Sequence, residues 1–86
     1  MSDARDLASD VIYTASERMS AKYGVTVVPE QRRSWLRVTN GFSVPELGIF
    51  QAVTWRRRWR GGEWQQLVPM TRAANAVGAA IRAHSG

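Results

Sequence analysis

Arginines and tryptophans dominate one short stretch of the chain, TWRRRWRGGEW, which covers residues 54–64. Three of its arginines, Arg56, Arg58 and Arg60, stand two residues apart. In an extended strand such residues share one face, with about 6.6–6.8 Å between neighbours. This separation is comparable to that of successive phosphates along a nucleic-acid strand, and guanidinium groups bind phosphate through paired hydrogen bonds. The spacing therefore predicts a row of phosphate contacts.

The adjacent Gly61 and Gly62 predict a two-residue turn between two antiparallel strands. Counting outward from this turn, the expected cross-strand pairs are Arg60–Glu63, Trp59–Trp64, Arg58–Gln65, Arg57–Gln66, Arg56–Leu67, Trp55–Val68 and Val53–Met70. In this register the three tryptophans and Arg57 share one face of a hairpin arm, and the other arginines line the opposite face. A slip of one residue would exchange the two faces.

Three interpretations of this arm remain open. Its arginines could bind phosphates while Trp59 or Trp64 stacks on bases. The arm could instead dock on a protein, because tryptophan and arginine are common at the energetic centres of protein interfaces. In the third interpretation, Trp59 and Trp64 form a supporting cross-strand pair, Arg60 and Glu63 form a weak surface ion pair, and the remaining arginines are solvated.

Positive charge is concentrated in the second part of the chain. Residues 1–30 carry five acids against three bases, whereas residues 31–86 carry nine arginines against Glu46 and Glu63. Arg32, Arg33 and Arg72 extend this basic character beyond the arm. A GC-rich genome would explain the preference for arginine over lysine, but it would not explain the clustering. The asymmetry indicates a polyanion, an acidic protein surface or another copy of the chain as partner.

Few residues offer other chemistry. The chain has no cysteine, and its one histidine, His84, lies three residues from the end, so a nucleophile paired with a base and a metal-ligand cluster are both unexpected. No phosphate-binding glycine loop of the common types occurs. We expect no catalytic residue, no metal, no cofactor and no enzymatic activity. Without a signal peptide or a long apolar run, we expect a cytoplasmic protein with no membrane contact.

Helices are expected at the two ends of the chain. In residues 3–23 the helical periodicity places on one face Ala4, Leu7, Ala8, Val11, Ile12, Ala15, Met19 and Tyr23. The opposite face carries Asp3, Asp6, Asp10 and Glu17, which could meet the arginines of a second copy, and Gly24 is suited to end the helix. Thr71 could cap a last helix with an apolar face of Ala73, Val77, Ala80 and Ile81. Gly78 suggests that this helix lies close to the sheet.

Between the helices the pattern predicts antiparallel strands. They are expected at residues 25–28, closed by Pro29, at residues 34–39, and in the long segment 47–60 with its partner 63–70. Asn40-Gly41 predicts a tight turn that returns the chain through residues 42–44. The prediction is one small α+β domain over residues 1–86, with a sheet of three to five strands, a long Trp/Arg hairpin and a helix at each end.

The order helix, strands, helix, together with TRAANAVGA and Arg72 at the start of the last helix, resembles the double-stranded-RNA-binding domain. The resemblance implies RNA contacts from the start of that helix. The sequence departs from the family in two respects. Thr71 and Asn75 stand where the family has lysines, and the first helix presents acids where the family contacts RNA.

The sequence therefore favours a small, basic, non-catalytic protein that binds nucleic acid without sequence preference, through the backbone. The candidate binding residues are Arg32, Arg33, Arg56, Arg58, Arg60, Arg72, Trp59 and Trp64. The alternative is a protein-interaction or assembly component, such as a phage-type structural subunit or an inhibitor of a host protein, which would use the same arm.

Overall fold

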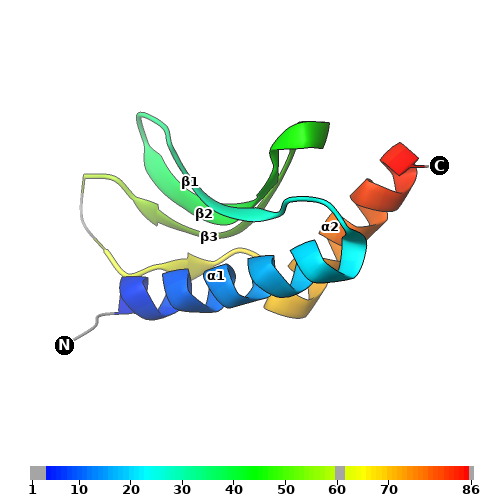
Figure 1. Cartoon of the computed structure of the whole chain (residues 1–86). Coiled ribbons are helices and arrows are strands. Elements are labelled where there is room, and N and C mark those ends of the chain that lie inside the picture. The colour runs from blue at the N-terminus through cyan, green and yellow to red at the C-terminus, as the bar shows by residue number, and fades with distance from the viewer. Residues whose placement is uncertain (1–3, 60–61, 86) are drawn as a thin grey trace.

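Two helices and a four-stranded antiparallel sheet form two layers in the computed structural model, which describes the backbone of residues 4–59 and 62–85 and the side chains of residues 10–59 and 62–84 (Figure 1). The element order is α1 (Ala4–Tyr23), β1 (Val28–Arg33), β2 (Arg37–Val44), the 3₁₀ turn η1 (Pro45–Leu47), β3 (Ile49–Arg57), β4 (Gln65–Gln66) and α2 (Met70–Ser85). The strands are neighbours in chain order. The expected α+β fold with a helix at each end is confirmed.

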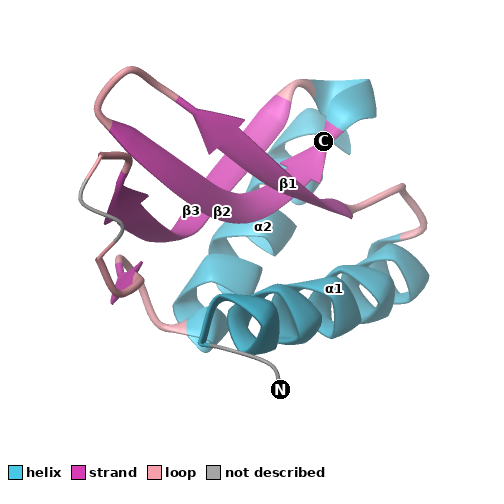
Figure 2. Cartoon of the chain, turned by 90° about the vertical axis from the view of Figure 1, so that its left-hand side faces the viewer, coloured by secondary structure: helices cyan, strands magenta, loops and turns pink. Residues whose placement is uncertain are grey.

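Both helices lie on the same side of the sheet (Figures 1 and 2). The core between the layers contains Ile12 and Met19 from α1, Val27, Phe42, Val44 and Val53 from the sheet side, and Ala73, Val77 and Ile81 from α2. No helix in the described part of the chain covers the other face, which we call the outer face. Any partner that binds the sheet has direct access to that face.

The helices largely follow their sequence signals. Gly24 adopts a left-handed conformation with φ of 70° and ends α1, and its amide donates to the Ser20 carbonyl at 3.0 Å. Ile12 and Met19 are buried, while Val11, expected on the apolar face, is 52% exposed. Of the predicted acidic face, Asp10 and Glu17 are exposed, and the side chains of Asp3 and Asp6 lie outside the described residues, as do those of Ala4, Leu7 and Ala8.

The first strand lies further along the chain than predicted. Residues 25–27 are not in a strand, and β1 continues through Pro29 to Arg33. Proline is tolerated there because β1 is an edge strand, whose residues need a hydrogen-bonding partner on one side only. Val27 is instead held by Ser20, whose hydroxyl accepts from the Val27 amide at 2.8 Å and lies 3.0 Å from its carbonyl oxygen.

The predicted turn at Asn40-Gly41 is wrong, because both residues lie within β2. The chain reverses instead at Trp35 and Leu36, since the Ser34 amide donates to the Arg37 carbonyl at 2.8 Å and Arg33 pairs with Val38. Gly41 has a different structural role. The register of β2 against β3 shifts at Asn40/Gly41, and a Cβ atom on Gly41 would lie 2.1 Å from the Gln51 carbonyl oxygen. Glycine is therefore needed for the close approach of β3.

The prediction of a long Trp/Arg hairpin is also wrong. Strand β3 ends at Arg57, β4 contains only Gln65 and Gln66, and Trp55 pairs with Gln65 where Val68 was expected. The register thus differs by three residues from the predicted one. Beyond Arg57 the backbone turns to the β1–β2 turn, because the Arg58 amide donates to the Leu36 carbonyl at 3.0 Å. The predicted pair of Arg60 with Glu63 and the Gly61 turn position involve residues outside the described part of the chain.

Candidate functional site

One end of the sheet gathers exposed arginines and aromatic side chains. This end, at the left of Figure 1, is formed by the β1–β2 turn and the last residues of β3. We call the side chains there the distal surface; they are Trp35, Leu36, Arg37, Trp55, Arg57, Arg58 and Trp59. Only Arg58 and Trp59 of this set were among the candidate residues from the sequence.

Two arginines face each other on the outer face. Arg37 of β2 is the direct cross-strand partner of Arg57 of β3, and both are exposed. The Arg37 guanidinium lies 5.1 Å from the centre of the Trp55 ring, so the arginine and the indole interact through a cation–π contact. Directly opposed like charges destabilise a strand pair. Within the described residues neither arginine forms an ion pair with a carboxylate, although Glu63 lines the same hollow as Arg57.

A tight loop holds the neighbouring aromatic residues in place. The Ser34 hydroxyl accepts hydrogen bonds from the amides of Leu36 at 3.3 Å and Arg37 at 3.1 Å, which fixes the turn that carries Trp35. The indole N–H of Trp59 donates to the Trp35 carbonyl at 3.1 Å, and the two rings meet edge to face with centroids 5.7 Å apart. Trp35 and Trp59 nevertheless remain 73% and 68% exposed. Their ring positions are set by the turn, while most of their ring surface faces solvent.

Arg58 extends the basic surface around this loop. Its side chain is exposed, and its guanidinium donates to the Ser34 carbonyl at 3.3 Å. This single long hydrogen bond leaves most of its five N–H donors without a protein partner that the structure shows. Arg37, Arg57 and Arg58 are thus three exposed cations in one neighbourhood, arranged around aromatic rings.

Two hollows adjoin Trp55 and Arg57. The first has a volume of about 380 Å³ and is lined by Leu36, Arg37, Trp55, Arg57 and Trp59. The second has a volume of about 390 Å³ and is lined by Trp55, Arg57, Gly62, Glu63 and Gln65. Trp55 and Arg57 therefore form a wall between two adjacent hollows, one mainly aromatic and basic, the other bearing polar groups.

Arg56, predicted to line the phosphate-binding face, points the other way. Its cross-strand partner is the buried Val38, and its guanidinium lies 5.0 Å from the ring centre of the half-buried Trp64. The Nε of Arg56 and the Nε1 of Trp64 are buried, and neither has a hydrogen-bonding partner among the described residues. The predicted Trp59–Trp64 pair is therefore replaced by Trp59–Trp35 and Arg56–Trp64. The register of β4 against β3 differs from the predicted one by three residues. Because this number is odd, Trp64 lies on the same face as Arg56 and not, as predicted, on the face of Trp55.

The other predicted site residues make different contacts. Arg32 lies on the outer face in the edge strand β1, where it covers the Phe50 ring at 4.0 Å and pairs with Glu30. Arg33, its neighbour in β1, points to the opposite side and donates to Gln31 at 3.3 Å. Arg72 is exposed on α2, in the helical layer. Arg60 lies outside the described residues.

The Glu30–Arg32 pair has an electrostatic consequence. The hydrogen bond from Arg32 lowers the pKa of the Glu30 carboxyl below its ordinary value of 4.5, against an opposing effect of desolvation, and a hydrogen bond with Ser43 lowers it further. Glu30 is therefore ionised at neutral pH and compensates part of the charge of Arg32. This acid lies beside Arg32, while the described part of the distal surface has no such partner for its arginines.

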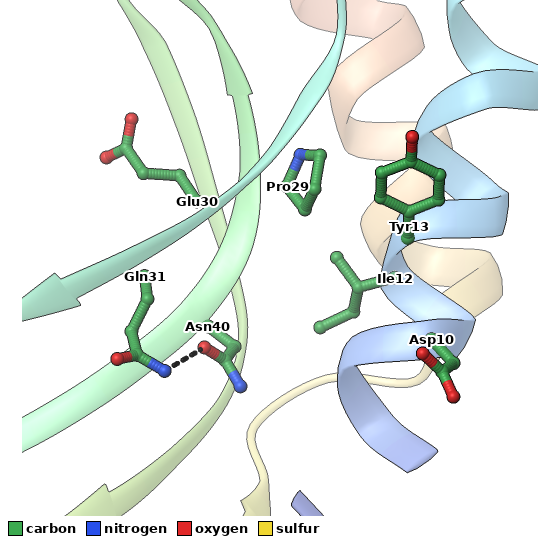
Figure 3. A pocket seen from close by; sticks show the side chains of 7 residues that line it. All are labelled: Asp10, Ile12, Tyr13, Pro29, Glu30, Gln31 and Asn40. Atoms are coloured by element: carbon green, nitrogen blue, oxygen red, sulfur yellow. Dashed lines mark hydrogen bonds between the residues drawn. The ribbon is translucent and has the colours of Figure 1, made fainter. Parts of the chain in front are cut away.

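A further hollow of about 300 Å³ separates α1 from β1 (Figure 3). Ile12 and Pro29 point into it, and the Gln31 side chain donates to Asn40 at 3.0 Å beside it. The carboxylates of Asp10 and Glu30 point away from its centre. The described residues also contain no group of three or more histidine or acidic side chains close enough to hold a metal ion. This hollow therefore offers fewer charged groups than the distal surface.

Five residues of the distal surface were not among the candidates from the sequence: Trp35, Leu36, Arg37, Trp55 and Arg57. Trp35 and Leu36 are large and apolar, unlike the residues that usually mark a turn, so residues 34–39 were predicted as a continuous strand. Had the turn been placed there, Arg37 would have been expected opposite the end of the arginine-rich strand. No family model, curated protein or solved structure matches this chain. Within the described residues, neither helix has both the length and the apolar character needed to cross a membrane.

Proposed function

We propose that this chain is a non-catalytic protein that binds nucleic acid through the distal surface. The observation that carries the proposal is that Arg37 and Arg57 are directly opposed on the uncovered face of the sheet, and that neither forms an ion pair with a carboxylate among the described residues. A strand pair gains nothing in stability from such an arrangement. A bound phosphate would compensate both charges, and Arg58 is near enough to the same loop to add a third contact.

The charge distribution and the aromatic rings support the same function. The formal net charge of +5 would attract a polyanion over a distance. Guanidinium groups bind phosphate oxygens in pairs, and exposed indole rings provide surfaces on which bases stack. None of these contacts requires a particular base, so binding is expected to depend on the backbone and to show little sequence preference.

Salt dependence tests this function directly. Fluorescence anisotropy with a labelled oligonucleotide should give a dissociation constant that rises steeply between about 50 and 200 mM salt, because each neutralised phosphate releases condensed counterions. With three phosphate contacts, the log–log slope should be about −2 on a single strand and about −3 on a duplex. Absence of binding to any DNA or RNA at the lowest salt concentration would disprove the proposal.

A protein partner is the second candidate, and one observation favours it. Trp35, Leu36 and Trp59 are 73%, 56% and 68% exposed at the same end of the molecule, which is unusual for side chains of this size. Such a patch is typical of protein interfaces. In this case the chain should form a defined oligomer in light scattering, or retain a partner on a column after nuclease treatment. A strictly monomeric chain that recovers no partner would contradict this alternative.

A further inference from the structure

We infer that the distal surface selects single-stranded nucleic acid, with unpaired bases entering the two hollows on either side of Trp55 and Arg57. This inference rests on the proposed function and narrows it to one class of ligand. The proposed function needs only phosphates, which a duplex and a single strand both provide. The shape of the surface gives the additional information.

The first hollow has walls suited to a flat ring. Trp55 and Trp59 both line it, together with Arg37, whose guanidinium lies 5.1 Å from the centre of the Trp55 ring. Its volume of about 380 Å³ lies within the range of small-ligand pockets, about 300–1,000 Å³. Bases within a duplex present their edges to a protein, because their faces are stacked on neighbouring bases. Only an unpaired base can place its face against these indole rings.

The rings are held in place before any ligand binds. The N–H of Trp59 is already bonded to the Trp35 carbonyl, so this indole has no donor left for a base edge and offers its ring surface instead. The Ser34 hydroxyl fixes the turn that supports Trp35 and Leu36. Because these side chains lose little freedom on binding, stacking should contribute strongly to affinity.

The second hollow extends the binding surface by one position. It shares Trp55 and Arg57 with the first hollow, and Glu63 and Gln65 on its far side can hydrogen-bond to base edges. A strand crossing this end of the sheet would place one base in each hollow and the phosphate between them near Arg57. Glu63 also places a negative charge at the second hollow, and this charge repels phosphate. We therefore expect a base of the strand in this hollow and not a phosphate.

The test compares three ligands with the same number of phosphates on the intact protein. They are a thymidine strand of about 12 nucleotides, a hairpin duplex, and a strand of abasic sites that keeps the phosphates but has no bases. The thymidine strand should bind about 5- to 150-fold more tightly than the abasic strand, as expected for the stacking of one base. It should also bind more tightly than the duplex. A uridine strand is included to compare RNA with DNA. The inference is supported if either single strand binds more tightly than both the duplex and the abasic strand.

Two matched variants assign the effect to the surface. Trp59→Ala should reduce the preference for thymidine over abasic strand to within about twofold and leave the binding of the abasic strand unchanged, because stacking is lost while phosphate contacts remain. Tyr13→Ala removes a similarly exposed aromatic side chain from α1 and should retain the preference. Both side chains are largely exposed, so both variants should fold.

The inference and the proposed function fail in different ways. If the duplex or the abasic strand binds as tightly as the thymidine strand, the inference is wrong and phosphate binding remains supported. The same conclusion follows if Trp59→Ala retains the full preference. If none of the ligands binds in a salt-dependent manner, both proposals are wrong and the distal surface is better explained by a protein partner.

Discussion

Gly41 shows how much of the sheet geometry depends on a single residue. A Cβ atom at this position would lie 2.1 Å from the Gln51 carbonyl oxygen and 2.9 Å from the Ala52 Cα, and neither backbone atom can move independently of β3. We expect Gly41→Ala to lower the free energy of unfolding by about 1–3 kcal/mol, measured by urea denaturation.

Gly62 provides the matched control for this prediction. A Cβ atom there meets nothing within 4 Å. Gly62→Ala should therefore change the free energy of unfolding by less than about 0.5 kcal/mol. If the two alanine variants are equally stable, β3 does not approach Gly41 as closely as the structure shows, and the register of the central strands is wrong.

Glu30 gives a prediction about pH. The folded chain lowers the pKa of this carboxyl, so ionised Glu30 stabilises the fold above its unfolded pKa, and this contribution is lost as the pH falls through the lower folded pKa. Glu30→Gln should be slightly less stable than the wild type at pH 7, by less than about 1 kcal/mol for a partly exposed pair. In thermal melts this difference should shrink as the pH falls below about 4. A difference that grows in acid would contradict the assigned direction.

Arg56 and Arg57 show why single residues were hard to assign from the sequence. Adjacent residues in a strand point to opposite faces, so the assignment of each arginine depends entirely on the register. Arg56 packs over Trp64 on the helical side, while Arg57 lies on the outer face opposite Arg37. The composition of the arginine-rich stretch could be read from the sequence, but its faces could not.

At the scale of the helices, Gly78 sets the distance between α1 and α2. A Cβ atom on Gly78 would lie 2.2 Å from the Tyr23 hydroxyl and 2.7 Å from the ring carbon that bears it. The close contact at Gly78 is therefore with α1, while the expected packing of α2 against the sheet is made by Ala73, Val77 and Ile81 in the shared core. Alanine would favour the helical conformation by about 1 kcal/mol, but in the native chain it would have to displace the Tyr23 ring.

A double-mutant cycle separates these two effects. Gly78→Ala should destabilise the native chain, yet stabilise the Tyr23→Ala variant by about 1 kcal/mol, because the obstructing ring is then absent. Urea denaturation of the four proteins gives the coupling energy. Equal effects of Gly78→Ala in the two backgrounds would show that Tyr23 does not control the approach of α2.

The elements differed in how well the sequence predicted them. Gly24 at the end of α1 and the apolar spacing of Ala73, Val77 and Ile81 in α2 are local signals, and these predictions agree with the structure. Thr71, predicted to cap α2, lies within that helix, which already begins at Met70. The strands depend on partners distant in sequence. Asn40-Gly41 has the composition of a tight turn, and only its position against β3 shows why glycine is needed within a strand.

The hairpin prediction failed for a related reason. Counting from Gly61 and Gly62 assumed that β3 and β4 pair mainly with each other. In the structure the end of β3 bonds to the β1–β2 turn through the Arg58 amide, and Trp64 packs on the helical side. The contact of Arg58 with Leu36 is long-range, so residues 54–64 alone do not indicate it, and the contact of Arg56 with Trp64 lies within that stretch but depends on the register. The sequence therefore singled out residues 54–64 without the residues of the β1–β2 turn that the structure places beside them.

For the molecule as a whole, the residues that build the core and the residues of the distal surface lie in different parts of the fold. The helices cover one face of the sheet and form the core with it, so the outer face and the distal surface are not needed to build the core. Substitutions of Arg37, Arg57 and Arg58 should consequently change binding far more than folding. Arginines on the helices, such as Arg18, Arg72 and Arg82, are exposed in the other layer and provide a set of equal charge for comparison.

The most direct test compares two triple variants that remove the same charge from different layers. We expect Arg37/Arg57/Arg58→Gln to reduce the magnitude of the log–log salt slope for single-strand binding by about 2, whereas Arg18/Arg72/Arg82→Gln reduces it by less than about 0.5. Circular dichroism should show that both variants fold. Equal reductions in the two variants would mean that net charge, and not the distal surface, controls binding. An unchanged slope in the first variant would contradict the central claim.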